Sequence, residues 1–175
     1  MAENTIRKIQ WFWPWQDEQE EAWLRSMSQK GWHLSSMGLP CIYRFRAGEP
    51  RDYVYRLDYQ IHKKGDQQDY LQLFHDAGWE HLGQMTAWHY FRKEVEEGEA
   101  LEIYTDVESK VAKYQRVLAY LAFFVVILIA VSHSIWSDIP YSWWVIFRVI
   151  YLLVMGCLIF SIVRLVLKIR QLRRL

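Results

Sequence analysis

The stretch EEAWLRSMSQKGWHLSSMGLPCIYRF, residues 20–45, decides the fold, because it occurs a second time in altered form. The second copy is QQDYLQLFHDAGWEHLGQMTAWHYF, residues 67–91. In both copies a leucine stands seven residues before a Gly-Trp pair, and the copies then end on a phenylalanine after 13 or 12 residues. Spacing kept to within one residue predicts two copies of one structural unit.

Each copy is typical of a helix followed by a β-hairpin. Apolar residues recur at helical spacing before the glycine, and Asp17 and Asp66 are the predicted N-caps. Gly31 and Gly78 stand where a left-handed residue ends a helix. A strand is predicted before each helix, over 6–13 and 53–60. The sequence therefore predicts an α+β domain, residues 1–104, whose two β-α-β-β repeats (6–46 and 53–93) form one mostly antiparallel sheet with both helices on one face.

Two apolar stretches follow this domain. Residues 117–136 and 143–164 are each long enough to span a bilayer as a helix, and the linking segment, 137–142, contains the helix breaker Pro140. Thr105 and Glu108 fit a capping box, which predicts a juxtamembrane helix, 105–116, that continues into the first span. The pattern predicts a transmembrane hairpin; two buried core helices are the disfavoured alternative.

The orientation of the hairpin follows from its flanking charges. Residues 109–175 carry nine basic side chains and one acidic side chain. All the basic ones except Arg148 flank the spans, and the connecting loop has none. The positive-inside rule then predicts a multi-pass protein of the cell membrane with N- and C-termini in the cytoplasm. The polar N-terminus lacks the pattern of a signal peptide. The basic tail, 165–175, is expected to lie along the anionic inner leaflet.

Arg148 is the charged residue inside the second span. It stands close to the predicted outer interface, so snorkelling to the headgroups is the preferred interpretation. A functional intramembrane charge is the alternative.

The domain carries no recognisable pattern for catalysis, a metal or a cofactor. Its histidines lack metal-ligand spacing, Cys41 is alone, and no phosphate-binding glycine loop occurs. The acid pairs Glu20-Glu21 and Glu96-Glu97 are interpreted as solvated faces. Residues 1–108 carry 19 acidic and 12 basic side chains, which disfavours direct binding to nucleic acid. We therefore expect a non-enzymatic protein without a metal or cofactor.

The predicted interaction site is the sheet face opposite the helices. It combines aromatic, aliphatic and arginine side chains, which are enriched at protein interfaces. Its members are Ile42, Arg44, Arg46, Trp88, Tyr90 and Arg92. The alternative is that the termini, loops or a second chain cover this face.

The repeat residues also carry a resemblance to a known family. The relevant positions are Trp23, Leu24, Gly31, Trp32, Tyr55, Tyr70, Gly78 and Trp79. Together they resemble DUF2812, a family of uncharacterised bacterial proteins, over about residues 8–106. The resemblance implies C-terminal membrane helices and genes that often neighbour PadR-like transcriptional regulators. It implies a structural role for these eight positions and supplies no active-site residues.

Three functional hypotheses follow. The first is a membrane-anchored regulatory or protein-interaction module, with a PadR-like regulator as the partner that the resemblance suggests. The second is a sensor of a small ligand or of membrane stress, or an accessory subunit of a transporter. The third, a membrane enzyme, requires histidine, aspartate and arginine side chains to converge in space. A homo-oligomer is compatible with all three, because Gly156 and Ser161 offer small residues for helix contact.

Overall fold

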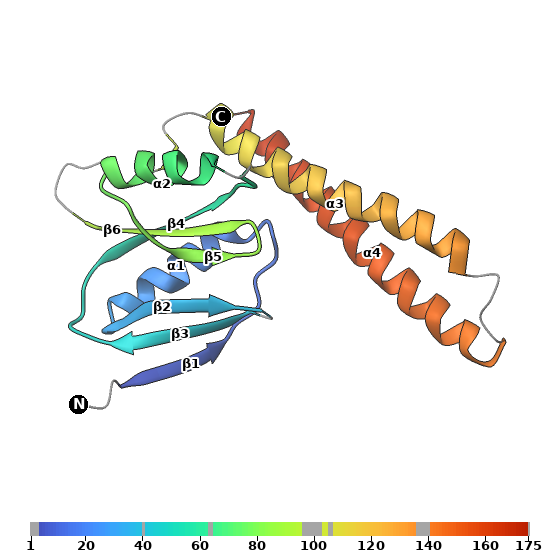
Figure 1. The fold of residues 1–175 in the computed structure, drawn as a ribbon, viewed down its shortest axis with the longest axis horizontal. Coiled ribbons are helices and arrows are strands. Elements are labelled where there is room, and N and C mark those ends of the chain that lie inside the picture. The colour runs from blue at the N-terminus through green and yellow to red at the C-terminus, as the bar shows by residue number, and fades with distance from the viewer. Residues whose placement is uncertain are drawn as a thin grey trace. The chain divides into compact units, whose positions relative to one another are not determined.

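The computed structural model describes residues 4–39, 41–62, 65–95, 103–104, 107–135 and 141–174 (Figure 1). The chain divides into two compact units, Met1–Ser109 and Lys110–Leu175. The first unit confirms the α+β class and the two β-α-β-β repeats. Its elements are β1 (Thr5–Ile9), α1 (Asp17–Ser28), β2 (Trp32–Gly38), β3 (Ile42–Ala47), β4 (Tyr53–Tyr59), α2 (Asp66–Asp76), β5 (Glu80–Met85) and β6 (Trp88–Glu94).

The segment before α1 differs from the prediction. β1 ends at Ile9 instead of Trp13, because the chain turns at Pro14: the Gln16 amide nitrogen donates to the Trp13 carbonyl oxygen at 2.8 Å. The predicted N-caps are also wrong by one position. Asp17 and Asp66 are the first residues of their helices, with Gln16 and Gly65 in the cap positions. The acidic side chains in these first turns instead favour the positive end of the helix dipole.

The two Gly-Trp pairs follow the repeat pattern closely. Gly31 and Gly78 both have φ of +80°, the left-handed conformation expected after a helix. Their surroundings differ, however. A Cβ at Gly31 would lie 2.6 Å from the Gly48 carbonyl oxygen, whereas one at Gly78 would lie 3.1 Å from Lys93 Nζ, the end of a flexible side chain.

This difference predicts unequal costs for the same substitution. Gly78→Ala should lower the free energy of unfolding by about 1 kcal/mol, the cost of left-handed backbone for a residue with a Cβ. Gly31→Ala should cost about 2 kcal/mol, because backbone must move as well. Chemical unfolding of the full chain in detergent, followed by far-UV circular dichroism, measures both. Equal losses would contradict the assigned clash at Gly31.

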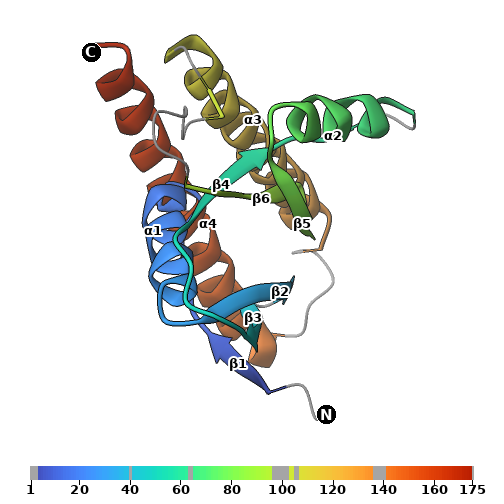
Figure 2. The same ribbon diagram turned by 90° about the vertical axis from the view of Figure 1, so that its left-hand side faces the viewer.

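The strands form two sheets of three strands rather than the single predicted sheet. One sheet has the order β1-β3-β2 and the other β4-β6-β5, and all pairs within them are antiparallel. Helix α1 lies between the two sheets, and α2 covers the far side of β4-β6-β5 (Figures 1 and 2). The helices therefore lie on opposite faces of the second sheet. The repeats stack with α1 packed against both sheets and with β2 of the first sheet in contact with β5 of the second.

Two apolar clusters hold this stack together. The larger cluster joins α1 to the inner faces of both sheets. Its buried members are Leu24, Met27, Leu34, Tyr43, Phe45, Tyr55, Leu57 and Tyr90. The smaller cluster lies between α2 and the other face of the second sheet, and its buried members are Val54, Phe74, Trp79 and Phe91. Strands β4 and β6 are thus covered on both faces, which explains their apolar residues at successive positions.

The second unit contains α3 (Val107–Ile135) from Lys110 onward and α4 (Tyr141–Leu172), and the two helices run antiparallel (Figure 1). Both are long and apolar enough to cross a membrane, and few residues of their apolar stretches are buried. The predicted tail is helical up to Leu172, so Lys168 and Arg170 belong to α4, whereas Arg173 and Arg174 follow it. Lys168 Nζ lies 4.6 Å from the centre of the Tyr114 ring at the start of α3. The predicted cap at Thr105 and most of the loop over 137–142 lie outside the described residues.

Candidate functional site

The predicted interaction face is split in the structure. Arg44 and Arg46 are exposed on β3, and Ile42 of the same strand is half-buried. Tyr90 is 1% exposed and belongs to the central core, while Trp88 packs against that core. The six residues therefore do not form one open surface. The prediction failed because β6 turns this face towards α1 of the other repeat.

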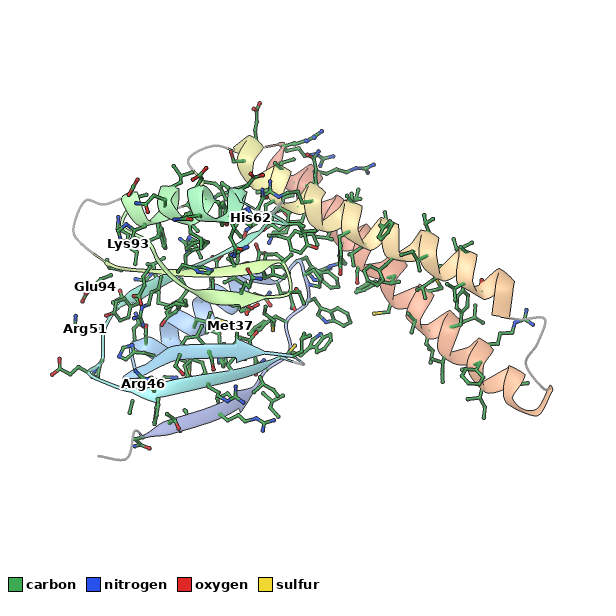
Figure 3. All side chains as sticks on the ribbon, in the orientation of Figure 1. Met37, Arg46, Arg51, His62, Lys93 and Glu94 are labelled. Carbon is green, nitrogen blue, oxygen red and sulfur yellow. The ribbon has the colours of Figure 1, made fainter. Side chains whose placement is uncertain are left out.

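A cleft between the two sheets gathers the charged residues instead. It has a volume of about 720 Å³. Its lining comes mainly from β2, β3, β5, β6 and the segment between β3 and β4. The lining residues are His33, Leu34, Ser35, Arg46, Gly48, Glu49, Arg51, Tyr53, Glu80, His81, Leu82 and Arg92. Arg46 and Arg51 lie at the end of the domain where β3 leads to β4 (Figure 3). Three arginines and two histidines thus share this cleft with two glutamates.

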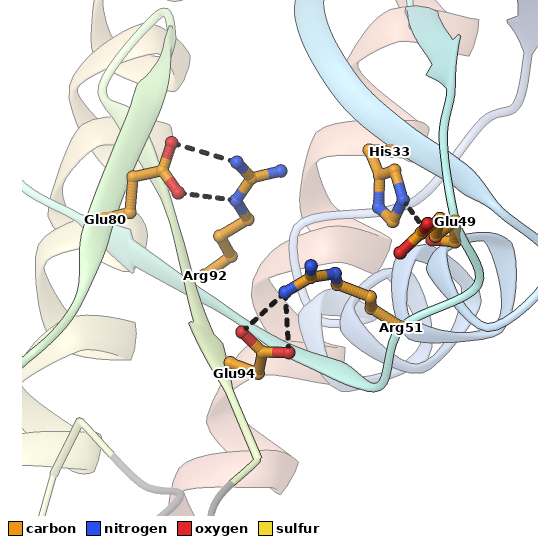
Figure 4. Close-up of polar contacts among 6 residues, drawn as sticks. All are labelled: His33, Glu49, Arg51, Glu80, Arg92 and Glu94. Atoms are coloured by element: carbon orange, nitrogen blue, oxygen red, sulfur yellow. Dashed lines mark hydrogen bonds and ion pairs between the residues drawn. The ribbon is translucent and has the colours of Figure 1, made fainter.

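Two arginine–glutamate pairs border the cleft (Figure 4). Arg92 Nε and Nη2 donate to the two carboxylate oxygens of Glu80 at 2.7 and 3.0 Å, and its guanidinium lies 4.8 Å from the centre of the Tyr53 ring. Arg51 reaches both oxygens of Glu94 through Nη1 alone, at 3.1 and 3.2 Å. Guanidinium groups have five N–H donors, so Arg51 keeps Nε and Nη2 for another acceptor.

His33 brings a further polar atom to the same cleft. Its Nε2 lies 2.8 Å from the Glu49 carbonyl oxygen, and only a protonated Nε2 can donate to that acceptor. In a neutral ring Nδ1 is then an acceptor, and this buried atom has no hydrogen-bond partner among the described residues. Gly48 makes room for the ring, since a Cβ there would lie 2.7 Å from His33 Cδ2.

A larger groove of about 870 Å³ runs along α2. Amide side chains of Gln67, Gln68 and Gln72 form much of its wall, and Glu80 and His81 border it as they border the cleft. Fewer charged groups converge here than between the sheets. We therefore take the inter-sheet cleft as the candidate site despite the groove's larger volume.

Three histidines lie close together: His62, His81 of β5 and His89 of β6. His89 Nδ1 lies 3.2 Å from His81 Nε2, and the His62 and His89 ring centres are 5.1 Å apart. Burial lowers the pKa of His81, and burial together with the neighbouring His81 and His62 lowers the pKa of His89 to about 4. These two rings are therefore neutral at pH 7. Within the described ranges, no group of three His, Cys, Asp or Glu is placed to hold a metal ion.

The buried Asp58 connects this cluster to the chain beyond the domain. Its carboxylate accepts hydrogen bonds from Tyr70 of α2, at 2.8 Å, and from Tyr104. Tyr104 lies three residues before α3 begins at Val107. The hydroxyls thereby tie α2 and the segment leading to α3 to the same residue of β4.

The interpretation of Glu20-Glu21 as a solvated face was wrong. Glu20 Oε1 accepts hydrogen bonds from the hydroxyls of Tyr43 and Tyr90, both at 2.7 Å, inside the core. Burial raises the pKa of Glu20, and the two tyrosines oppose that rise. Glu21 accepts from the Leu57 amide nitrogen at 2.8 Å. The helical spacing of the sequence does not show whether this face of α1 is buried or exposed to solvent. Glu96-Glu97 lies outside the described residues.

The family positions lie in the interior and at its helix ends. Leu24, Tyr55 and Trp79 are buried, and Gly31 and Gly78 end helices. Trp23, Trp32 and Tyr70 pack around the two apolar clusters. The sequence prediction missed the cleft residues Arg51 and Glu80, because their spacing shows no motif and only the stacking of the repeats brings them together.

A duplicated α+β domain followed by two apolar helices defines the class of this protein. A model of the DUF2812 family, described as proteins of unknown function, matches residues 16–126. This match covers more than half of the chain, so the protein belongs to the DUF2812 family, and it extends into α3. Comparisons with curated proteins and with solved structures found no match.

Proposed function

We propose that the protein is a membrane-anchored regulatory module without catalytic activity. In this proposal α3 and α4 cross the cell membrane as a hairpin, and both chain ends lie in the cytoplasm. The support is the length and exposed apolar surface of both helices, together with basic residues at their cytoplasmic ends. The domain then presents its cleft to the cytoplasm.

The ligand that we propose for the cleft is a compact anion with at least two carboxylate or phosphate groups. The observation that carries this proposal is the convergence of Arg46, Arg51 and Arg92 in one cleft. Planar guanidinium groups match carboxylate and phosphate oxygens in pairs. The volume of about 720 Å³ suits a small molecule. The carboxylates of Glu80 and Glu94 hold the guanidinium groups of Arg92 and Arg51 in place at the border of the cleft.

The output that we propose is a contact with a protein partner. A PadR-like regulator is the partner that the family resemblance suggests. Occupation of the cleft would bias that contact, since the cleft joins elements of both repeats and its ligand stabilises one arrangement of them.

A binding experiment tests the ligand. The full chain, purified in detergent, is titrated with citrate, inorganic pyrophosphate and other small di- and trianions, while its thermal unfolding is followed. We expect at least one of these anions to raise the melting temperature, because a ligand of the native state stabilises it. Arg51→Gln should weaken that binding about tenfold, the loss expected for a charged hydrogen bond. Lys30→Gln, an exposed change outside the cleft lining, is the control.

Two results would overturn the assignment of the cleft. The first is that no anion in the panel changes the melting temperature. The second is that Arg51→Gln and Lys30→Gln weaken binding equally, since general screening of charge affects both.

A further inference from the structure

The charges of the domain are unevenly distributed between its sheets. None of the residues in β1, β2 or β3 is acidic, whereas these strands contain Arg7, Lys8, Arg44 and Arg46. This is unusual within residues 1–108, where acidic side chains outnumber basic ones by 19 to 12. The sheet β1-β3-β2 therefore presents a basic surface on an acidic domain.

Two of these arginines stand directly opposite each other. Arg7 of β1 and Arg44 of β3 are register partners on the outer face, and both are exposed. Like charges opposite each other destabilise a sheet. Neither forms an ion pair in the described part of the chain that would offset this repulsion. An anionic surface outside the molecule would relieve it.

Large apolar side chains lie at one end of the same sheet. Ile9 is 70%, Leu39 68% and Trp11 58% exposed. Ile9 pairs with Ile42, and the Gln10 amide nitrogen donates to the Cys41 carbonyl oxygen at 3.1 Å, which holds the end of β1 beside the turn between β2 and β3. Exposed tryptophan and aliphatic groups beside arginine suit the interface between headgroups and acyl chains.

The chain leaves the domain at this same end. Cys41, Met85 and Trp88 line one small cavity, so the β2–β3 and β5–β6 turns lie together. β4 also ends there, because Tyr59 pairs with Trp88. Asp58, next to Tyr59, binds Tyr104, and α3 begins three residues later.

We propose that this end of the β1-β3-β2 sheet is a docking surface for an anionic lipid bilayer. The docking surface consists of Arg7, Ile9, Trp11, Leu39 and Arg44. The arginines bind headgroup phosphates, and the apolar side chains enter the interface. A second copy of the chain is a poorer occupant, because the charged residues Arg7 and Lys8 on the edge strand β1 oppose strand pairing. The docking rests on the proposed anchoring by α3 and α4, which brings the surface within reach of lipid.

Lipid quenching in nanodiscs tests the docking surface. The full chain carries Cys41→Ser and Cys157→Ser and one new labelling site: Leu39→Cys, Glu49→Cys or Leu153→Cys. Each is coupled to a bimane fluorophore, and the nanodiscs contain a spin-labelled quencher lipid. We expect strong quenching at position 39 in discs rich in phosphatidylglycerol and weak quenching in phosphatidylcholine. Glu49, beyond the opposite end of β3, should stay unquenched, and Leu153, exposed in the middle of α4, should be quenched in both lipids.

Charge variants separate lipid docking from other causes. Arg7→Gln and Arg44→Gln should each lower the docking equilibrium about fivefold, the contribution of one basic residue near an anionic surface. Lys30→Gln, at the other end of the domain, should leave it unchanged. Absence of quenching at position 39 while position 153 is quenched would overturn the docking alone. Absence at both positions would overturn the anchoring. Disulfide cross-linking between Leu39→Cys chains without quenching would assign the surface to a second copy and also overturn the proposal.

Discussion

Glu20→Leu should lower the free energy of unfolding by about 3 kcal/mol, because it removes the acceptor for two buried hydroxyl groups. Glu20 Oε1 accepts from Tyr43 and Tyr90 at 2.7 Å, and both tyrosines are about 1% exposed. A buried donor without a partner costs the full loss of its hydration. Urea unfolding of the full chain in detergent, read by tyrosine and tryptophan signals, measures the loss.

The matched control removes the donors together with the acceptor. In a chain that carries Tyr43→Phe and Tyr90→Phe, Glu20→Leu should cost little, since apolar groups then replace the whole hydrogen-bonded cluster. A loss of the same size in that background would show that the leucine disrupts packing and that the hydrogen bonds are not the cause.

The pH dependence gives a second, independent readout at Glu20. Burial raises the pKa of its carboxyl above the ordinary value of 4.5. The folded state therefore holds the proton more tightly than the unfolded state, and this stabilisation is complete below pH 4.5 and disappears as the pH rises through the raised pKa. Glu20→Gln keeps an oxygen acceptor but does not titrate. As the pH rises, the unfolding free energy of Glu20→Gln should increase relative to that of the natural chain. Parallel profiles of unfolding free energy against pH would contradict the raised pKa.

The repeat allowed most of the local structure to be predicted from the sequence. The helix–glycine–hairpin units, the left-handed conformations of Gly31 and Gly78, and β4 follow from short-range spacing. The arrangement of the two repeats could not be predicted in the same way, because a repeat does not say whether its copies join edge to edge or stack. One signal was present in β4, where Val54, Tyr55 and Leu57 supply apolar groups to both faces. Such a strand needs cover on both sides, which a sheet with both helices on one face does not provide.

The candidate site could not be predicted from the sequence, because it depends on how the two repeats pack against each other. Arg92 and Arg51 belong to the second sheet and to the segment between the repeats, whereas His33 belongs to the first sheet. No spacing along the chain links them, and the stacking of the repeats alone brings them to one cleft. The same stacking buries Tyr90 and so removes the predicted aromatic face. Long-range packing, which short motifs do not encode, therefore decides where this domain can bind a ligand.

His89 should make the domain sensitive to mild acid. The ring is 1% exposed, and burial with the charges of His81 and His62 lowers its pKa from 6.5 to about 4. Because the folded state resists protonation, stability is complete above pH 6.5 and falls as the pH drops towards 4. The difference of pKa corresponds to a loss of about 3 kcal/mol. Asp58 and the Gln60 backbone oppose the shift but do not cancel it.

His89→Phe isolates this effect, since phenylalanine keeps a ring between α2 and β6 and does not titrate. Its unfolding free energy should fall less between pH 6.5 and 4 than that of the natural chain; the remaining loss comes from His81, whose pKa burial also lowers, and Glu20 contributes an opposing rise. His75→Phe, on the exposed side of α2, is the control and should retain the acid loss. Urea unfolding across this pH range measures all three chains. If His89→Phe and the natural chain lose stability in parallel, His89 is not the group that titrates. Glu20→Gln combined with His89→Phe should remove the contributions of both groups to the pH dependence of the unfolding free energy. The two contributions have opposite signs, because the carboxyl favours its protonated form in the core while the imidazole favours its neutral form there.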